Sequence, residues 1–208
     1  MTEYIPLFPL KLVPFPGEDL NLHIFEPRYK QLIKDCMEGK NCFGVAVYLD
    51  ELTQFGTEVE LIEVFKTYDD GKLDIRTKAI RPFEILTFDN PMLGKLYAGG
   101  EVRYLENDPK VSEVVFNEFM LYLKEMMRLL NYEVNFSAFT VSSFTFAHVL
   151  GLKLEDEFEL LLITKEEDRQ VFLTDHFKKM IPIMKDVEHA KEKIKMNGHF
   201  KNLDPLNF

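Results

Sequence analysis

Tryptophan is absent from the sequence, and cysteine occurs only twice among its 208 residues, as Cys36 and Cys42. Two cysteines exclude the disulfide framework on which small secreted domains depend. No second close pair of cysteines accompanies them, and the five histidines form no His-Glu-x-x-His pattern, so the sequence predicts no metal site. A disulfide between Cys36 and Cys42 is one alternative, and we favour a reduced pair in the cytoplasm.

The sequence also lacks any apolar run close to the roughly 20 residues that a membrane-spanning helix needs. Its first residues have neither the basic start nor the apolar segment of a signal peptide. These absences predict a cytoplasmic protein with no membrane partner. Basic residues are in the minority, because Lys and Arg total 25 while Asp and Glu total 35, which gives a net charge of −10. Such a charge repels phosphate backbones, so it disfavours nucleic acid as a partner.

Motifs for catalysis and for nucleotide binding are missing as well. The sequence contains no G-x-x-x-x-G-K-[ST] loop to hold phosphates and no G-x-S-x-G turn to expose a nucleophilic serine. Ser142 and Ser143 stand close to His148, but a serine that caps a helix explains this spacing better than a catalytic pair does. We therefore expect no catalytic residue and no cofactor.

What the sequence does contain is typical of a globular protein, with 46% hydrophobic and 29% charged residues. In the first half, short apolar or alternating segments bounded by turn residues predict strands. These segments are residues 4–10, 20–24, 43–49, 58–66, 73–80, 83–88 and 96–105. One helix is predicted from Pro27 to Gly39, and Asp69-Asp70-Gly71 predicts a hairpin turn. Several short strands with one helix favour a small, partly closed barrel.

The second half changes to helical periodicity, beginning where Asp108 can cap a helix and Pro109 can start it. The predicted helices are residues 109–129, residues 144–150, residues 154–162 and a long last helix after a capping box at Thr164 and Glu167. We expect the tail from Gly198 onward to be frayed. The change of pattern predicts two domains, a β-rich one at 1–108 and a helical bundle at 109–208, and hence an α+β fold class.

Three motifs occur in order near the N-terminus: Phe15-Pro16-Gly17, then Phe25-Glu26-Pro27-Arg28-Tyr29, then Phe43-Gly44-Val45. Through these motifs and their spacing, residues 1–105 resemble the N-terminal substrate-recognition domain of Lon proteases, and the helical half fits more loosely. The resemblance implies an N-terminal PUA-like β pseudo-barrel with one helix, followed by a C-terminal α-helical bundle. It also implies a stand-alone bacterial protein, because the sequence shows no motif of the ATPase and Ser-Lys peptidase modules of the full enzymes.

Nine residues of this region are candidates for binding polypeptide or for shaping the binding region: Pro14, Phe15, Pro16, Gly17, His23, Phe25, Glu26, Arg28 and Tyr29. Prolines stiffen the loop around Phe15, which either holds its ring at the surface for a partner or plugs the core. Gly17 suits the tight turn. Structural roles explain Glu26 as a helix cap and Arg28 as the partner of a carboxylate or of backbone carbonyls.

The favoured hypothesis is a non-catalytic substrate-recognition module that binds unfolded or flexible polypeptides. Its site would be an apolar groove between barrel and bundle, or an open sheet edge that accepts a strand. A protease or a chaperone is a further candidate partner, and the sequence does not indicate an oligomeric state. The alternative is an RNA-binding PUA-like module, which would need a basic stripe on the barrel. The candidates for that stripe are Arg76, Lys78, Arg81 and Arg103.

Overall fold

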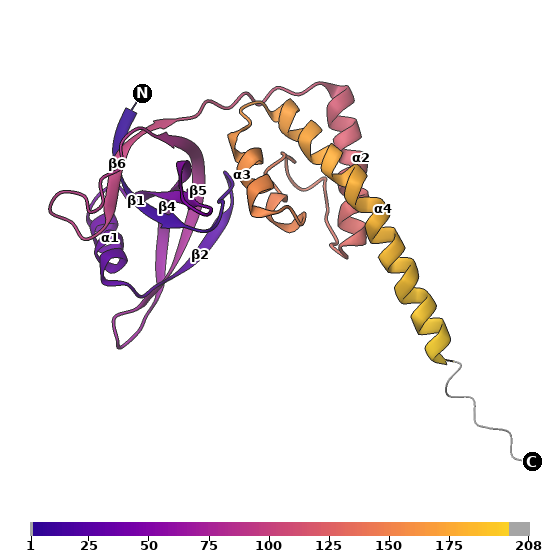
Figure 1. The fold of residues 1–208 in the computed structure, drawn as a ribbon, viewed down its shortest axis with the longest axis horizontal. Coiled ribbons are helices and arrows are strands. Elements are labelled where there is room, and N and C mark those ends of the chain that lie inside the picture. Colours follow the sequence, from indigo (N-terminus) through magenta and orange to yellow (C-terminus); the bar gives the residue numbers. More distant parts are fainter. Residues whose placement is uncertain (1, 200–208) are drawn as a thin grey trace, which may run out of the picture. The chain divides into compact units, whose positions relative to one another are not determined.

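The computed structural model describes residues 2–199, and in that part of the chain the fold combines six β-strands with four α-helices (Figure 1). The strands are β1 (Thr2–Leu10), β2 (Asp19–Ile24), β3 (Cys42–Tyr48), β4 (Leu52–Thr67), β5 (Leu73–Ile85) and β6 (Ala98–Tyr104). The helices are α1 (Pro27–Glu38), α2 (Glu113–Leu129), a short 3₁₀ helix η1 (Ala147–Val149), α3 (Leu154–Leu162) and α4 (Glu166–His199). The predicted α+β class is confirmed. The prediction of a frayed tail falls mostly beyond His199 and so lies outside the described residues.

All six strands belong to one sheet, in the order β2-β5-β4-β3-β1-β6. The long strand β5 pairs with β2 along its first half and with β6 at its end, and this second pairing closes a circuit of five strands. Strands β1 and β3 are parallel, and the other pairs are antiparallel. The closed circuit leaves β2 as the strand with a neighbour on one side only. A closed circuit fits the predicted barrel, while the PUA-like relationship stays a prediction.

The chain forms two compact units, and each unit consists of two separate segments of the chain. This division differs from the predicted one, in which two continuous segments meet at residue 108. The first unit holds the residues up to Pro109 together with Ser142–Glu166, and the second holds Lys110–Val141 together with the residues from Glu167 onward. The segment with η1 and α3, predicted to belong to the helical bundle, is therefore part of the strand-rich unit. That the chain folds as two independent domains, 1–108 and 109–208, stays a prediction.

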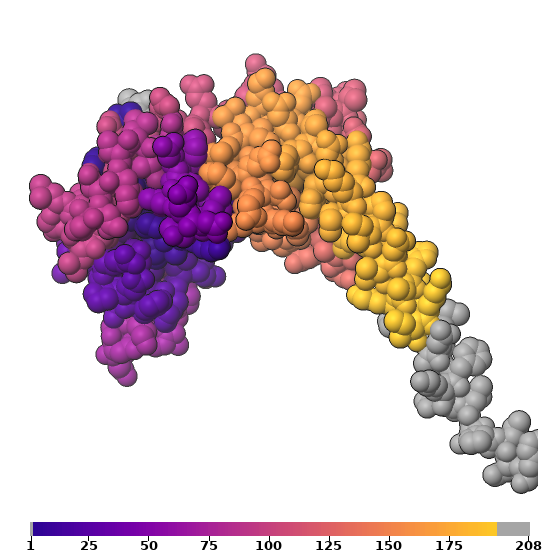
Figure 2. Space-filling view, viewed as in Figure 1, coloured from indigo at the N-terminus to yellow at the C-terminus, as the bar shows by residue number. Residues whose placement is uncertain are grey.

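Aromatic contacts explain why the segment with η1 and α3 joins the strands. The ring of Phe144 stacks on that of Phe15, with 5.4 Å between the centroids, and Phe158 meets Phe55 edge-on at 6.1 Å. In the space-filling view, orange residues of this segment lie against purple and indigo residues of the strands (Figure 2). Sequence periodicity cannot predict contacts of this kind, because they join residues more than 100 positions apart.

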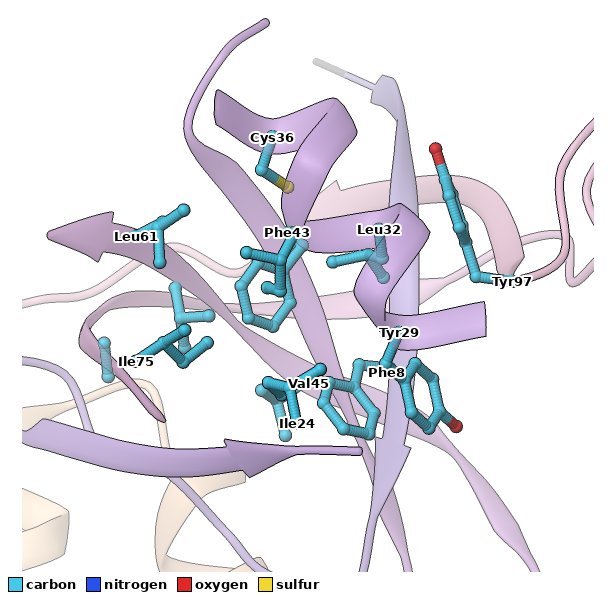
Figure 3. Packing of buried hydrophobic residues seen from close by; sticks show 13 residues of the cluster. Phe8, Ile24, Tyr29, Leu32, Cys36, Phe43, Val45, Leu61, Ile75 and Tyr97 are labelled. Carbon is cyan, nitrogen blue, oxygen red and sulfur yellow. The ribbon is translucent and has the colours of Figure 1, made fainter. Parts of the chain in front are cut away.

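The main core of the first unit lies between α1 and the sheet (Figure 3). Tyr29, Leu32, Ile33 and Cys36 form the buried stripe of α1, as their spacing predicts. On this stripe the ring of Tyr29 stacks on Phe8 of β1 at a centroid distance of 3.7 Å, and Phe8 in turn lies 6.2 Å from Phe43 of β3. The core therefore fixes the position of α1 relative to β1 and β3.

Strand β5 corrects one prediction, since residues 73–80 and 83–88 were expected as separate strands with a break near Pro82. The strand is continuous because Pro82 falls between the residues that pair with β2 and those that pair with β6. On the edge of β5 that pairs with β2 and β6, neither strand is paired at Pro82, so the missing N–H group removes no hydrogen bond of the ladder. The predicted turn at Asp69-Asp70-Gly71 is confirmed, and it joins β4 to β5.

The start of α2 corrects another prediction, because the helix begins at Glu113 rather than at Pro109. Asp108 is held instead in extended backbone: its N–H donates to the carbonyl oxygen of Thr164 at 2.9 Å, and its carbonyl accepts from the N–H of Glu166 at 2.8 Å. A long-range backbone pairing thus overrides the local capping signal. The helix begins four residues later, after Ser112.

Two further predictions about helices are wrong because side chains bind other groups, although the long last helix itself is confirmed as α4. Of the helix expected at 144–150, only the three residues of η1 are helical. Just before η1, the Thr145 Oγ1 accepts from the Ser142 N–H at 2.9 Å, and this side-chain bond competes with the backbone bonds of a regular helix. The capping box does not form either, because α4 begins at Glu166 and the Glu167 carboxylate accepts from the Ser112 hydroxyl at 2.6 Å. The helix at 154–162 is confirmed as α3.

Candidate functional site

The proline-rich loop between β1 and β2 is fixed by hydrogen bonds to side chains. The hydroxyl of Thr57, which is fully buried, donates to the carbonyl oxygen of Pro14 at 2.7 Å. The carboxylate of Glu18 accepts from the N–H of Phe15 at 3.0 Å. The first bond ties the loop to β4, and the second joins two residues of the loop itself.

The ring of Phe15 lies in the interior of the first unit. The residue has no exposed surface, and its ring stacks on Phe144. Pro14 is also buried, and Pro16 is half-buried. The alternative in which Phe15 presents an apolar ring to a partner is therefore wrong, and the core alternative holds. The flanking prolines fix the backbone where it turns inward to insert the ring.

Gly17 turns the chain toward β2 with a φ of +89°, and its N–H donates to the carbonyl oxygen of Ala79 at 2.8 Å. A side chain added there would meet open space, so any cost comes from the left-handed backbone alone. We expect Gly17→Val to lower the free energy of unfolding by about 1–3 kcal/mol. Thermal denaturation checks this, with Gly17→Asn as the matched control, because asparagine tolerates this region and should cost less. Equal thermal midpoints for Gly17→Val and the native protein would contradict the assignment.

The start of α1 gathers three more of the predicted residues. The Arg28 Nε donates to the Glu26 carboxylate at 2.9 Å, and its guanidinium lies 4.5 Å from the ring centroid of Tyr29. The Glu26 side chain makes no capping hydrogen bond, so its predicted role as a side-chain cap is wrong. Tyr29 is buried, and burial raises the pKa of its hydroxyl. Glu26 and Arg28 are thus partly exposed partners at the surface, and Tyr29 belongs to the core.

An exposed aromatic surface lies on β2, β4 and β5 and on the residues that directly follow β2 and β4, and it contains two of the predicted residues. We call it the hairpin surface, and its members are His23, Phe25, Phe65, Tyr68, Asp74 and Arg76. The side chains of Phe25 and Phe65 are large and apolar, yet the residues are 57% and 50% exposed. Large apolar rings that are left in water beside polar groups are typical of interaction sites.

The hairpin surface is organised around His23. Its ring lies 6.1 Å from that of Phe25 and 5.7 Å from that of Tyr68, and its Nδ1 lies 2.6 Å from Asp74 Oδ1. The other carboxylate oxygen of Asp74 accepts from the Tyr68 hydroxyl at 2.7 Å. The hydrogen bonds from His23 and Tyr68 keep the pKa of Asp74 below its ordinary value. These contacts hold the rings in one arrangement before any partner binds.

Phe65 reaches the same surface because of a β-bulge. In the pairing of β4 with β5, Val64 lies opposite Ile75 and Lys66 lies opposite Asp74, so Phe65 is the extra residue. A second register shift, between Leu61 and Glu63, similarly leaves Ile62 as an extra residue that is 48% exposed. Val59 and Leu61 of β4 are buried, so regular alternation would also have hidden Phe65, and the interrupted register instead leaves its ring in solvent.

The charged members of this region are paired across the strands. The guanidinium of Arg76 lies 5.9 Å from the ring centroid of Phe65 and 2.8 Å from the Glu63 carboxylate. The ammonium of Lys66 lies 4.3 Å from the ring centroid of Tyr68. Cation–π contacts of this kind, between exposed groups, hold the aromatic rings in place and surround them with polar groups.

Strand β2 forms the open edge of the sheet beside the hairpin surface. Its register with β5 is regular from Asp19 to Ile24, and no proline or lysine interrupts it. Because the carbonyl of Glu18 accepts from the N–H of Ala79, the alternation of an antiparallel ladder turns the backbone groups of Asp19, Asn21 and His23 away from β5. These groups form a template for one more strand.

A cavity of about 220 Å³ lies elsewhere in the first unit, lined in part by Asp35, Cys36, Cys42 and Tyr97. Asp35 accepts from the Tyr97 hydroxyl and from Lys95, both at 2.7 Å, and Lys95 in particular lowers its pKa. Burial raises the pKa of the Cys36 thiol to about 12, and burial also raises the pKa of the Cys42 thiol. Both cysteines are free thiols that stay protonated at neutral pH, which makes them poor nucleophiles.

The serine and histidine residues considered for catalysis have other contacts. The Ser143 hydroxyl donates to Glu166 at 2.7 Å, Ser142 lies 3.1 Å from the Thr145 hydroxyl, and His148 Nδ1 lies 3.9 Å from Glu18. Within residues 2–194, no three His, Cys, Asp or Glu side chains are grouped so that they could hold a metal ion. The helices described for this chain are also too short or too polar to span a bilayer.

The basic residues considered for RNA binding do not form a stripe. Each faces a carboxylate across the sheet: Arg76 faces Glu63, Lys78 faces Glu60, Arg81 faces Glu58 and Arg103 faces Glu84. Three of these pairs are in direct contact, among them Arg81 with Glu58 at 2.7 Å. Phosphate binding would have to compete with these acidic partners, so the arrangement does not favour the RNA alternative.

The sequence indicated His23 and Phe25 of the hairpin surface but missed Phe65, Tyr68, Asp74 and Arg76. The predicted turn at 69–71 was a usable signal for Tyr68 and Asp74, because it brings together the ends of β4 and β5 on which or beside which they lie. Phe65 had no such signal, since a bulge leaves no reliable mark in a single sequence.

Comparison with known proteins agrees with this fold. The protein-family model of the ATP-dependent protease La (LON) substrate-binding domain matches residues 4–183. A crystal structure of a Lon N-terminal domain protein from Xanthomonas campestris superimposes with a TM-score of 0.65 and 27% sequence identity, and the match covers 82% of this chain and 96% of that one. The N-terminal domain of the Mycobacterium avium complex Lon protease shares the fold, with a TM-score of 0.63 at 14% identity over 85% of this chain and 98% of that one.

Proposed function

Since the chain belongs to the family of ATP-dependent protease La (Lon) substrate-binding domains, we propose that it recognises flexible polypeptide segments and binds them in extended form at the hairpin surface and along the open edge of β2. Recognition rather than catalysis is the role proposed for it. Its two thiols stay protonated, and the carboxylates of Asp35 and Asp74 are tied to neighbouring donors.

The exposure of Phe25 and Phe65 is the observation that carries this proposal. Burying an aromatic ring is among the strongest contributions to binding, and the contacts with His23 and Arg76 already order these rings. Little side-chain entropy then remains to be lost when a partner binds. The paired charges around the rings supply a polar rim without a net attraction for one sign of charge.

The open edge of β2 supplies the preference for unfolded partners. A segment that adds to this edge must present free backbone N–H and C=O groups, which folded proteins have already paired. Main-chain hydrogen bonds give affinity without regard to sequence, whereas Phe25 and Phe65 favour segments with apolar side chains. Delivery of the bound segments to a protease or a chaperone is part of the same proposal.

A binding titration tests the proposal. We expect a dye-labelled, reduced and alkylated model protein to bind the native chain weakly, with an anisotropy change that its folded form does not cause. The double variant Phe25→Ser/Phe65→Ser should bind at least about tenfold more weakly, since each lost aromatic anchor typically costs 1 kcal/mol or more. Its thermal midpoint should stay close to that of the native chain, because both residues are half exposed.

The matched control is Leu93→Ser, because Leu93 is 98% exposed and lies in the same unit but outside the hairpin surface. It should bind as the native chain does. Equal affinity of the double variant and the native chain would place the binding site elsewhere. Binding of the folded form as tightly as the unfolded one would remove the role of the β2 edge.

A further inference from the structure

In the second unit, α4 is longer than the helix that packs against it. The two helices are joined by the ring contact of Phe119 with Phe177 and by ion pairs down to Lys185 with Glu125 and Arg128 with Glu188. Helix α2 ends at Leu129, and α4 continues past this point to His199. Figures 1 and 2 show its last coloured turns, in yellow, extending beyond the end of α2.

An apolar stripe that faces solvent begins on α4 beside the end of α2 and continues onto this extension. Ile183, Val187, Ala190 and Ile194 follow one another at intervals of four, three and four residues, the spacing of a coiled-coil seam. Ile183 is 56% exposed, Val187 48% and Ile194 71%. On the helix these positions lie roughly opposite Ile181, which faces the interior. A helix that is apolar on two opposite faces has one face for its own core and one left for a partner.

We propose that the partner is a second copy of this chain, bound through the same stripe in an antiparallel helix pair. About a two-fold axis near Glu188, Ile183 of one copy packs on Ile194 of the other, and Val187 packs on Ala190. One small residue in each central layer lets the two helices approach closely. Both copies contribute the same residues to the interface, as two-fold symmetry requires.

The charges beside the stripe match this arrangement. Asp186 and Lys193 lie on the same flank, and an antiparallel pair places equal flanks of the two helices together. Asp186 of each copy then faces Lys193 of the other, so the symmetry makes two such pairs. The opposite flank, with Met184 and Lys191, brings no two like charges together. The stripe is therefore complementary to itself in charge as well as in apolar pattern.

An antiparallel pair also fits the surroundings of the stripe better than a parallel one. Further up α4 the same face continues through Phe172 and Met180, which are already half covered by their own chain. A parallel partner helix would have to run alongside these covered residues, whereas an antiparallel partner helix overlaps mainly between Ile183 and Ile194. A groove of about 350 Å³ opens beside Ile183 and Val187 at the end of α2, where Ile194 of the second copy can enter.

The family match does not by itself imply the proposed interface. The family match ends at Ile183, so most of the stripe lies outside the shared part of the sequence. The stripe and the hairpin surface belong to different units, so the dimer and the proposed polypeptide binding can be tested separately. A stripe this short predicts weak, concentration-dependent pairing.

Analytical ultracentrifugation of the full chain tests the dimer between about 10 µM and about 1 mM. We expect the weight-average mass to rise from 24.4 kDa toward twice that value. Val187→Glu should abolish the rise, whereas Val171→Glu, a similarly exposed valine of α4 outside the stripe, should not. Asp186→Lys should weaken the pairing and Asp186→Lys/Lys193→Asp should restore it.

A native chain that stays at the monomer mass over the whole range would overturn the proposal, as would a Val187→Glu variant that still associates. A third contrary result is association that Val171→Glu abolishes to the same degree, because the interface would then lie elsewhere on α4. Pairing that neither charge variant changes would overturn the antiparallel arrangement. None of these outcomes bears on binding at the hairpin surface.

Discussion

Replacing Phe15 by alanine is expected to lower the free energy of unfolding by about 3–5 kcal/mol, the usual cost of emptying a buried phenylalanine site. The ring has no exposed surface, and it is stacked on Phe144 from the segment with η1 and α3. The loop around it cannot collapse into the cavity easily, since Pro14 is held by the Thr57 hydroxyl. Chemical denaturation measures the loss, and hydrogen exchange should show residues 142–152 opening first.

The control for this prediction is Phe25→Ala, which removes the same ring from an exposed position. Its stability should change by no more than about 0.5 kcal/mol. If Phe15→Ala were as stable as the native chain and Phe25→Ala were not, the two aromatic residues would have exchanged roles, and Phe15 would again be the candidate for a surface anchor.

Gly56→Ala is expected to be nearly as damaging, with a loss of about 3 kcal/mol, because the site has no room for a methyl group. An added Cβ would lie 2.3 Å from the Val45 carbonyl oxygen and 2.7 Å from the Phe83 ring. The first of these neighbours is backbone of β3, so it cannot move aside without disturbing the pairing of β3 with β4. The close approach of three strands at this point requires glycine.

Gly94→Ala is the matched control, because an added Cβ at Gly94 would meet open space. Its cost should be limited to about 1–2 kcal/mol, from a left-handed backbone conformation. Thermal and denaturant unfolding of both variants separates the two causes. A Gly56→Ala protein that is as stable as Gly94→Ala would show that the strands can separate here at little cost.

Local patterns in the sequence sufficed for the elements whose cause is local. The stripe from Tyr29 to Cys36 predicted α1, and the turn at Asp69-Asp70-Gly71 predicted the joining of β4 and β5. These patterns failed where pairing with a distant part of the backbone determines the local structure. Asp108 is a good helix cap by itself, but its pairing beside Lys165 keeps it extended. Pro82 marks a strand break by itself, but it falls where β5 changes partner.

The binding region was predictable in part for the same reason. Phe25 begins the motif at the start of α1 and His23 stands two residues before it, whereas Phe65 depends on a bulge that only the pairing of β4 with β5 reveals. Phe15 could not be assigned from sequence at all, because its burial depends on Phe144, which is far away in the chain. Residues of one binding surface can thus differ in how strongly the local sequence indicates them.

Amide hydrogen exchange with and without a bound unfolded polypeptide tests the central claim most directly. If the partner adds as a strand to β2, the amides of Asp19, Asn21 and His23 should become protected on binding, because they point away from β5 in the free protein. The amides of Leu20 and Leu22, which already face β5, should change little. Saturation of the chain with polypeptide while Asp19, Asn21 and His23 exchange as fast as before would contradict the account.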